Sequence, residues 1–206
     1  MSDDGDLVAL CRAGDAVAFR QLFREHRVTV TRLVHRMLGS SADLEDLVQE
    51  VFVQVHKSLG SFRREAQLGT WIYRIAINVV LMHRRAQKSR PAAVSGPPDA
   101  SAVDESALPD EQLARRRRVG ALYRLLDRMS EKKRTVYVLH ELEGLTPAEI
   151  AKVVGAPVLT VRTRLFYARR TLLAELPHEP ALAALAEGLP PLSDPAPAGE
   201  PHKEPA

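Results

Sequence analysis

Apolar residues recur at spacings of three and four along most of the chain, and this pattern predicts an all-α protein. In the N-terminal part it indicates a short helix over 6–12 and then a long helix that Asp15 can cap. A third helix ends at Gly60, and a fourth runs over 70–85. Four helices joined by short loops favour one compact domain over residues 5–88.

The helical pattern stops over residues 89–110, where prolines, alanines, serines and acidic residues predominate. This stretch is predicted to be a flexible acidic linker. Helical periodicity resumes over 111–143 and continues into a helical hairpin, which gives a second helical domain over 111–176. Eight prolines fall within 177–206, so we expect a disordered tail with at most one turn of helix near 181–187.

The stretch 145–170 predicts a helix-turn-helix. Thr146 can cap its first helix, Pro147 suits the first helical position, and Glu149 completes a Thr-x-x-Glu capping box. A glycine then breaks the pattern, and Pro157 can start the second helix.

That second helix has one apolar stripe and one basic, aromatic face. The stripe comprises Val158, Val161, Leu165, Ala168 and Leu172. The opposite face presents Thr160, Arg162, Thr163, Phe166, Tyr167, Arg169 and Arg170. Such a helix fits the major groove of DNA, where its basic side chains reach phosphates and base edges. The alternative is an ordinary helical hairpin with a solvated face, but the capping box, turn and basic face together favour DNA binding.

The formal net charge is only +3, but basic residues are concentrated in two blocks. Residues 62–90 hold seven Lys or Arg against one acidic residue, and residues 111–176 hold fourteen against seven. The intervening stretch 91–110 and the tail 177–206 each carry a net charge of −4. Two basic modules separated by an acidic linker indicate two contacts with a polyanion.

Several other classes of protein fit the sequence poorly. The single Cys11 leaves no partner for an internal disulfide and no cysteine-rich zinc site. The acidic N-terminus lacks the apolar core of a signal peptide, and Arg74 and Asn78 interrupt the longest apolar region. We therefore expect a cytoplasmic protein without membrane insertion. Because the seven histidines are scattered and the chain has no phosphate-binding glycine loop or serine elbow, we expect no cofactor, no metal and no enzymatic activity.

Two motifs carry a resemblance to a known family. Residues 43–52 read Asp-Leu-Glu-Asp-Leu-Val-Gln-Glu-Val-Phe, and residues 62–78 read Phe-Arg-Arg-Glu-Ala-Gln-Leu-Gly-Thr-Trp-Ile-Tyr-Arg-Ile-Ala-Ile-Asn. Followed by a linker and a helix-turn-helix, they strongly resemble the extracytoplasmic-function (ECF) sigma factors of bacterial RNA polymerase. The resemblance covers about residues 5–90 and 108–176. It implies a region 2 domain, a region 4 domain, and the partners core polymerase, promoter DNA and an anti-sigma factor.

The third predicted helix is expected to supply the polymerase contact. Its apolar stripe faces the core, which leaves a line of polar residues and one valine outside. The resemblance implies that this motif docks on the clamp of the β′ subunit, whereas the C-terminal domain meets the flap of the β subunit. A solvated acidic face is the alternative. The proposed docking residues are Asp43, Asp46, Gln49, Glu50 and Val53.

The loop and fourth helix combine aromatic rings, positive charge and an amide, a mixture that suits single-stranded DNA. The resemblance implies that this surface reads the promoter −10 element and captures a flipped base. Its candidate residues are Phe62, Arg63, Arg64, Tyr73, Arg74 and Asn78. Trp71 is expected to pack against the loop instead.

The recognition helix is implied to read the −35 element. Arg162, Thr163 and Phe166 match base-reading positions of relatives, whereas Arg164, Arg169 and Arg170 suit phosphates. Thr160 and Tyr167 lie on the same predicted face. Two departures stand out: Leu159 replaces a usual glycine, and His140 stands where an arginine often contacts phosphate.

Two other functions compete with this interpretation. A one-component transcriptional regulator would bind an operator through the same helix-turn-helix. It would need a ligand pocket or phosphoacceptor domain at the N-terminus and a dimerising element, and no heptad seam is evident. An enzyme would need a cluster of nucleophilic or buried carboxylate groups, and the sequence suggests none.

Overall fold

The computed structural model describes residues 4–39, 43–63, 67–89 and 110–186, and within these ranges every regular element is helical. The all-α prediction is therefore confirmed. Arg64 and the predicted linker, apart from its terminal residues Ser89 and Asp110, lie outside the described residues. No helix of the described part is long and apolar enough to cross a membrane.

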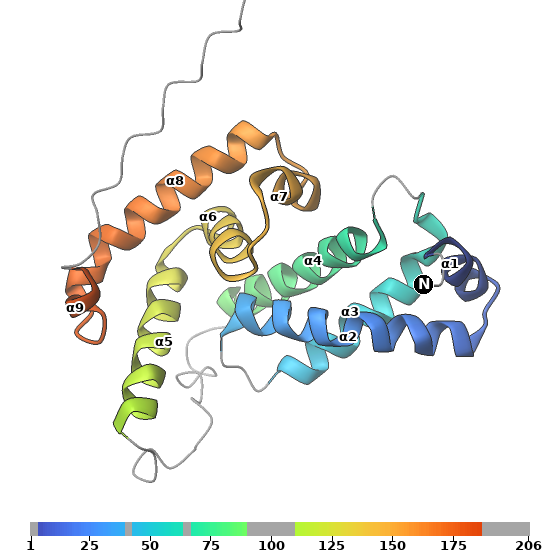
Figure 1. Cartoon of the computed structure of the whole chain (residues 1–206), viewed down its shortest axis with the longest axis horizontal. Coiled ribbons are helices and arrows are strands. Elements are labelled where there is room, and N and C mark those ends of the chain that lie inside the picture. Colours follow the sequence, from blue (N-terminus) through green and yellow to red (C-terminus); the bar gives the residue numbers. More distant parts are fainter. Residues whose placement is uncertain (1–3, 40–42, 64–66, 90–109, 187–206) are drawn as a thin grey trace, which may run out of the picture.

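The N-terminal domain is a bundle in which α2 packs on α1, α3 and α4 (Figure 1). Asp15 caps α2 as predicted, because its carboxylate accepts hydrogen bonds from the backbone N–H groups of Val17 (2.7 Å) and Ala18 (3.2 Å). Gly39 ends α2 with a φ of 84°. The fourth helix is longer than predicted at both ends. The elements are α1 (Asp4–Arg12), α2 (Ala16–Leu38), α3 (Leu44–Ser58), η1 (Leu59–Ser61) and α4 (Leu68–Ser89).

The C-terminal domain contains the predicted helix-turn-helix. Thr146 and Glu149 form the capping box, and Gly155 takes the left-handed conformation (φ 63°) between the two helices. The helical pattern predicted over 111–143 is interrupted near its end, because Val138–Leu142 form a π-helical turn. The elements are α5 (Asp110–Arg128), α6 (Glu131–Tyr137), η3 (Val138–Leu142), α7 (Pro147–Val154), α8 (Val158–Glu175), η4 (Leu176–His178) and α9 (Ala183–Ala186).

The segment after α8 folds back along α5, so residues 177–180 are ordered where disorder was predicted, whereas α9 falls within the turn of helix expected near 181–187. Leu176 and Leu182 are buried, and the buried Glu179 carboxylate lies 2.9 Å from the Arg124 guanidinium. Proline content suggested disorder, but two leucines and one paired carboxylate suffice to hold this short segment. Residues 187–206 lie outside the described part of the chain.

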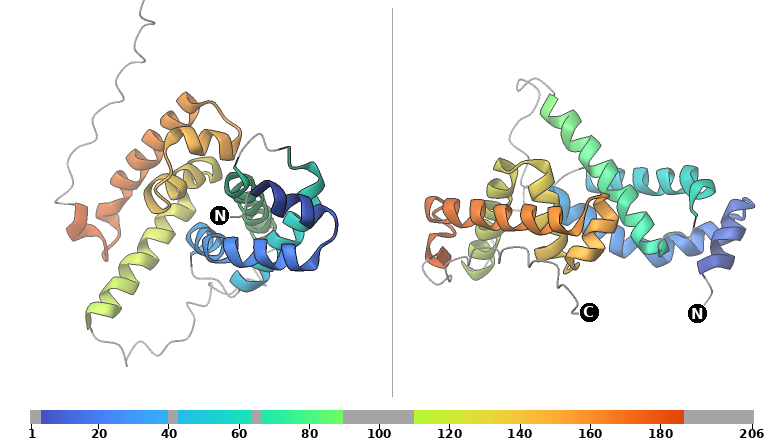
Figure 2. Two further views of the ribbon diagram at one scale, coloured as in Figure 1. Left: turned by 45° about the vertical axis from the view of Figure 1, so that its right-hand side comes forward. Right: turned by 90° about the horizontal axis from the view of Figure 1, so that it is seen from above.

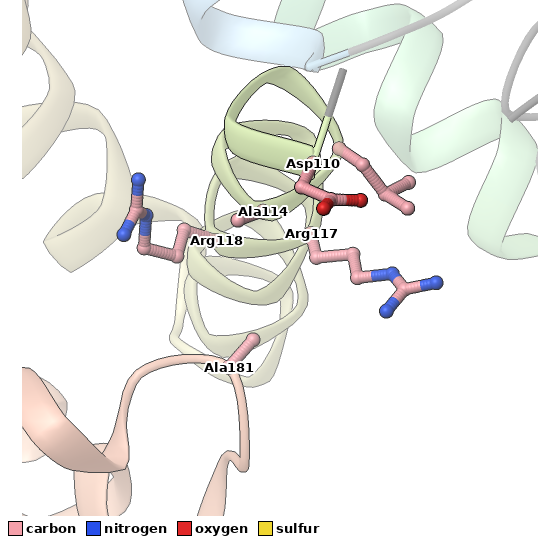
Figure 3. A pocket seen from close by; sticks show the side chains of 6 residues that line it. Asp110, Ala114, Arg117, Arg118 and Ala181 are labelled. Atoms are coloured by element: carbon pink, nitrogen blue, oxygen red, sulfur yellow. The ribbon is translucent and has the colours of Figure 1, made fainter. Parts of the chain in front are cut away.

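This C-terminal segment leaves a shallow pocket of about 340 Å³ beside α5. Figure 3 shows Arg117 and Arg118 extending on opposite sides of the helix, away from each other. The remaining lining comes from Asp110, Leu113, Ala114 and Ala181. Because the cations do not converge, this pocket lacks the directed polar groups of a small-molecule site.

The two domains are packed against each other. Figures 1 and 2 show α7 lying on α4, and η3 contacts α2. At the end of α2 the Tyr123 ring of α5 covers Gly39 so closely that a Cβ there would meet the ring at 3.0 Å. The chain is thus in a closed arrangement in which helices of both domains share one interface.

Candidate nucleic-acid and polymerase interfaces

The core side of α8 is close to its prediction. Val161, Leu165, Ala168 and Leu172 are buried, because α8 packs against α6 and α7, whereas Val158 at the helix start is more than a third exposed. The predicted DNA-facing residues therefore lie on the outer side. Arg162, Thr163, Tyr167 and Arg170 are exposed, and Thr160, Arg164, Phe166 and Arg169 are half-buried.

Some of these residues already have partners within the domain. The Arg169 guanidinium lies 2.6 Å from a carboxylate oxygen of Glu141, and the Lys133 ammonium lies 5.6 Å from the centre of the Tyr167 ring. His140 is half-buried, and its Nδ1 donates a hydrogen bond to the Leu145 carbonyl (2.8 Å). His140 thus fixes the turn before α7, a role that the sequence pattern did not indicate.

Four of the five residues predicted for docking lie on the outer face of α3. Asp46, Gln49, Glu50 and Val53 are all exposed, and they lie opposite the buried stripe of this helix. Asp43 differs from the other four. It occupies the N-cap position without a side-chain capping bond.

The Asp43 carboxylate instead faces α4. It lies 3.2 Å from His83 Nε2 and accepts a hydrogen bond from the Gln87 amide (3.2 Å). Asp43 therefore ties α3 to α4 in addition to lying beside the acidic face.

Phe62 is not an exposed stacking residue in this structure. Its side chain is only 6% exposed, and its ring centre lies 5.2 Å from that of Trp71. The Arg12 guanidinium donates hydrogen bonds to the Phe62 and Leu59 carbonyls, which holds this loop against α1. The prediction of an exposed Phe62 is wrong because a large aromatic ring beside an apolar helix end is more stable in the core. The packing of Trp71 against the loop is confirmed, and the neighbouring Arg63 is exposed.

The part of the predicted DNA-binding surface that lies on α4 is only partly free. Asn78 is exposed, but the Arg74 guanidinium donates to the Lys152 carbonyl of α7 (2.5 Å). The Tyr73 hydroxyl donates to a Glu143 carboxylate oxygen (3.2 Å), and burial, reinforced by this carboxylate, raises the pKa of Tyr73. The C-terminal domain thus occupies part of the surface expected to bind DNA.

Glu143 is the centre of an ionic group between the domains, which we call the Glu143 cluster. Its carboxylate side chain is 1% exposed, and it lies 2.8 Å from Arg36 and 3.5 Å from Arg32 of α2. The π-helical turn positions it, since the Glu143 N–H bonds to the Val138 carbonyl five residues earlier (3.0 Å). The members are Arg32, Arg36, Tyr73 and Glu143.

A second interdomain group, the Glu131 cluster, lies near the other end of α4. Arg84 lies 3.1 Å from Glu131 and 3.0 Å from Asp127, and it is nearly buried. Arg134 of α6 contacts Asp127 (2.6 Å) and donates to the Met37 carbonyl of α2 (2.8 Å). The members are Arg84, Lys88, Asp127, Glu131 and Arg134.

The cations of the Glu131 cluster change the pKa of Glu131 itself. Burial alone would raise the pKa of Glu131, but hydrogen bonds from Arg84 and Lys88 outweigh burial and lower it. Glu131 therefore remains ionised and bridges α6 to α4 near neutral pH.

Comparisons with known proteins show which family the chain belongs to. Residues 22–90 match the description "Sigma-70 region 2", and residues 120–172 match "Sigma-70, region 4". The RNA polymerase sigma-H factor of Pseudomonas aeruginosa is 31% identical over 182 residues, which cover 82% of this chain and 91% of that protein. The ECF RNA polymerase sigma-E factor of Escherichia coli K12 is 34% identical over 178 residues, 82% of this chain and 92% of that protein. The chain belongs to the ECF sigma factors.

Solved structures share the fold of this sigma factor. CnrH, solved in complex with the cytosolic domain of CnrY, matches 85% of this chain and 98% of that chain, with 27% identity and a TM-score of 0.60. The sigma factor RpoE of Bartonella quintana, solved with the anti-sigma factor NepR, matches 76% of this chain and 94% of that chain. Its identity is 20% and its TM-score 0.52, so it supports the fold alone.

The sequence missed the interdomain residues of this sigma factor. Glu143, Arg36 and Arg84 are spread over more than a hundred residues, and none belongs to a motif quoted for the family. A buried carboxylate with two arginines is visible only when the helices are assembled.

Proposed function

We propose that this sigma factor binds core RNA polymerase through α3 and directs it to promoters by reading two DNA elements. The observation that carries the proposal is the α8 surface, where exposed Thr163 and Arg170 lie opposite the buried stripe of a capped helix-turn-helix and exposed Arg162 lies beside them. A recognition helix of this geometry enters the major groove with one face.

Polymerase docking is assigned to the exposed α3 face of Asp46, Gln49, Glu50 and Val53. Two carboxylates beside an apolar residue suit a basic helical partner, and we assign this contact to the clamp of the β′ subunit. The C-terminal domain is proposed to meet the flap of the β subunit.

The −10 element is assigned to the start of α4 and the loop before it. Arg63 and Arg74 supply positive charge, Tyr73 supplies a ring, and Asn78 supplies an amide for a base edge. Arg64 is kept in this set from the sequence. Phe62 is reassigned, since its buried ring holds the loop in place rather than stacking on DNA.

The −35 element is assigned to α8. Arg162, Thr163 and Phe166 are proposed to face bases, and Arg170 faces phosphate. The remaining candidates lie at the edge of this surface: His140, Thr160, Arg164, Tyr167 and Arg169.

The closed arrangement is proposed to be a resting form. Elements centred about 25 base pairs apart lie roughly 85 Å apart along B-form DNA, whereas α4 and α7 are in contact here. The domains must therefore separate before both elements are read. We further propose that an anti-sigma factor holds the closed form. Support comes from the similarity to CnrH, which was solved with a second protein bound.

In this proposal the sigma factor acts in the cytoplasm, uses no cofactor and performs no catalysis of its own. Run-off transcription with purified core polymerase on genomic fragments tests the function. Discrete start sites that require this chain, each preceded by shared −10 and −35 sequences, are expected. A stable homodimer that binds operators and does not associate with core polymerase would favour the one-component regulator and overturn the proposal.

Two substitutions test which residues of α8 read bases and which contact phosphate. We expect Arg162→Ala to relax discrimination at one −35 base pair by roughly 1–3 kcal/mol. Arg170→Ala should weaken all sequences equally and lower the salt slope by about one. Equal weakening of every variant by Arg162→Ala would make Arg162 a phosphate contact.

A further inference from the structure

Leu159 lies at the centre of the outward face of α8. It is the second residue of the helix and is 63% exposed, although leucine is usually a core residue. Thr163, Phe166 and Arg170 follow it at spacings of four, three and four, so all four residues form one line along the helix. This line is opposite the buried stripe, whereas Arg162 lies about a quarter-turn to one side.

The N-terminal half of this line is chemically apolar. The Thr163 hydroxyl donates its hydrogen to the Leu159 carbonyl (2.9 Å), so this donor is already used within the helix. Phe166 continues the line with a half-buried ring 5.4 Å from that of Tyr167. The first positively charged member of the line is Arg170, three turns from Leu159.

An apolar side chain at this place has a specific complement in DNA. Recognition helices contact base edges mainly with their N-terminal residues. Among the major-groove edges, thymine offers a C5 methyl group, and apolar side chains recognise it by direct contact.

We propose that Leu159 is a specificity residue that contacts the C5 methyl of one thymine in the −35 element. This inference rests on the proposed −35 function of α8. It adds an apolar contact at the start of the helix to the base contact assigned to Arg162.

The test removes the thymine methyl group and the end of the Leu159 side chain in turn. Holoenzyme is assembled from core polymerase and the full chain, and its −35 element is defined by selection from a random duplex library. Each thymine of that element is then replaced singly by deoxyuridine, which lacks the C5 methyl and keeps the same pairing. Binding is measured for wild type, Leu159→Ala and the neighbouring control Val158→Ala.

We expect wild type and Val158→Ala to lose about three- to fivefold in affinity at one thymine, the factor that corresponds to burying one methyl group. Leu159→Ala should bind the deoxyuridine and thymine duplexes equally at that position. Because the side chain is exposed, its thermal unfolding should match wild type.

Three results would overturn the assignment. They are a selected element without thymine, equal wild-type affinity for every deoxyuridine duplex, or an undiminished deoxyuridine effect in Leu159→Ala. Each leaves sequence-specific −35 binding intact. A wild-type holoenzyme that selects no −35 sequence would instead contradict the proposed function itself.

Discussion

Replacing Glu143 by glutamine should open the closed arrangement. The substitution keeps the shape of the side chain but removes the charge that faces Arg32, Arg36 and Tyr73. Breaking a fully buried ion pair costs about 3–5 kcal/mol, and a charge-assisted hydrogen bond contributes about 1.5–3 kcal/mol. Arg32 and Arg36 are 50% and 34% exposed, so water can solvate them after the change. The lower figures therefore apply, and we expect about 2 kcal/mol, or roughly a thirtyfold rise in the ratio of open to closed protein.

Two binding measurements on the free sigma factor detect this opening. The closed form covers Tyr73 but leaves the outer face of α8 exposed. Affinity for a single-stranded −10 oligonucleotide should therefore rise by up to thirtyfold in Glu143→Gln, because apparent affinity scales with the competent fraction. Affinity for a −35 duplex should not change. Fluorescent labels on Val28→Cys and Val119→Cys, both exposed positions, report the separation directly in a Cys11→Ser background.

The matched control is Glu175→Gln, which removes a carboxylate that pairs with Arg128 inside the C-terminal domain (2.9 Å). It should leave both affinities and the label distance unchanged. If Glu143→Gln behaves like this control, the cluster does not hold the domains together. If both DNA affinities rise equally, the change acts on general charge rather than on opening.

Three further predictions follow from the site geometry. Glu50→Lys should weaken core polymerase binding without destabilising the fold. Glu25→Lys makes the same charge change at an exposed position of α2, and this variant should compete for core polymerase as strongly as wild type. Equal competition by both variants would contradict the docking assignment. Phe62→Ala should lower the free energy of unfolding by about 3–5 kcal/mol in urea, and a loss below about 1 kcal/mol would contradict the buried position. Because its pKa is lowered on folding, Glu131 contributes stability that is complete above its ordinary pKa of 4.5 and is lost as pH falls through the lower folded value. Urea unfolding across that range should therefore be less pH-dependent in Glu131→Gln than in wild type.

Local signals explain what the sequence could predict. The capping box of Thr146 and Glu149 and the cap of Asp15 depend on residues three positions apart or fewer, so the motif itself carries the geometry. The exposed faces of α3 and α8 follow from one period of 3.6 residues. These features include most of the proposed docking and −35 residues.

Long-range contacts explain which features could not be predicted from the sequence. The hydrogen bond between Arg36 and Glu143 joins residues 107 positions apart, and no local pattern marks either of them. The sequence does not place Phe62 correctly, because an aromatic residue in a basic loop gives the same sequence pattern whether its ring is buried or stacked on a base. The fold-back of residues 177–186 depends on Glu179 finding arginines on α5, about fifty residues earlier.

The position of the two ionic clusters on α4 determines how the domains can move apart. Tyr73 and Arg84 are separated by eleven residues, or about 16 Å along the helix axis. Ionic contacts thus hold the C-terminal domain at two places along α4, and losing one of them leaves the other as a pivot. Loss of the Glu143 contact should swing the domain away from Tyr73 while Arg84 remains held. Loss of the Glu131 contact should swing the opposite end and leave Tyr73 covered, so the two ionic contacts have unequal effects on access to DNA.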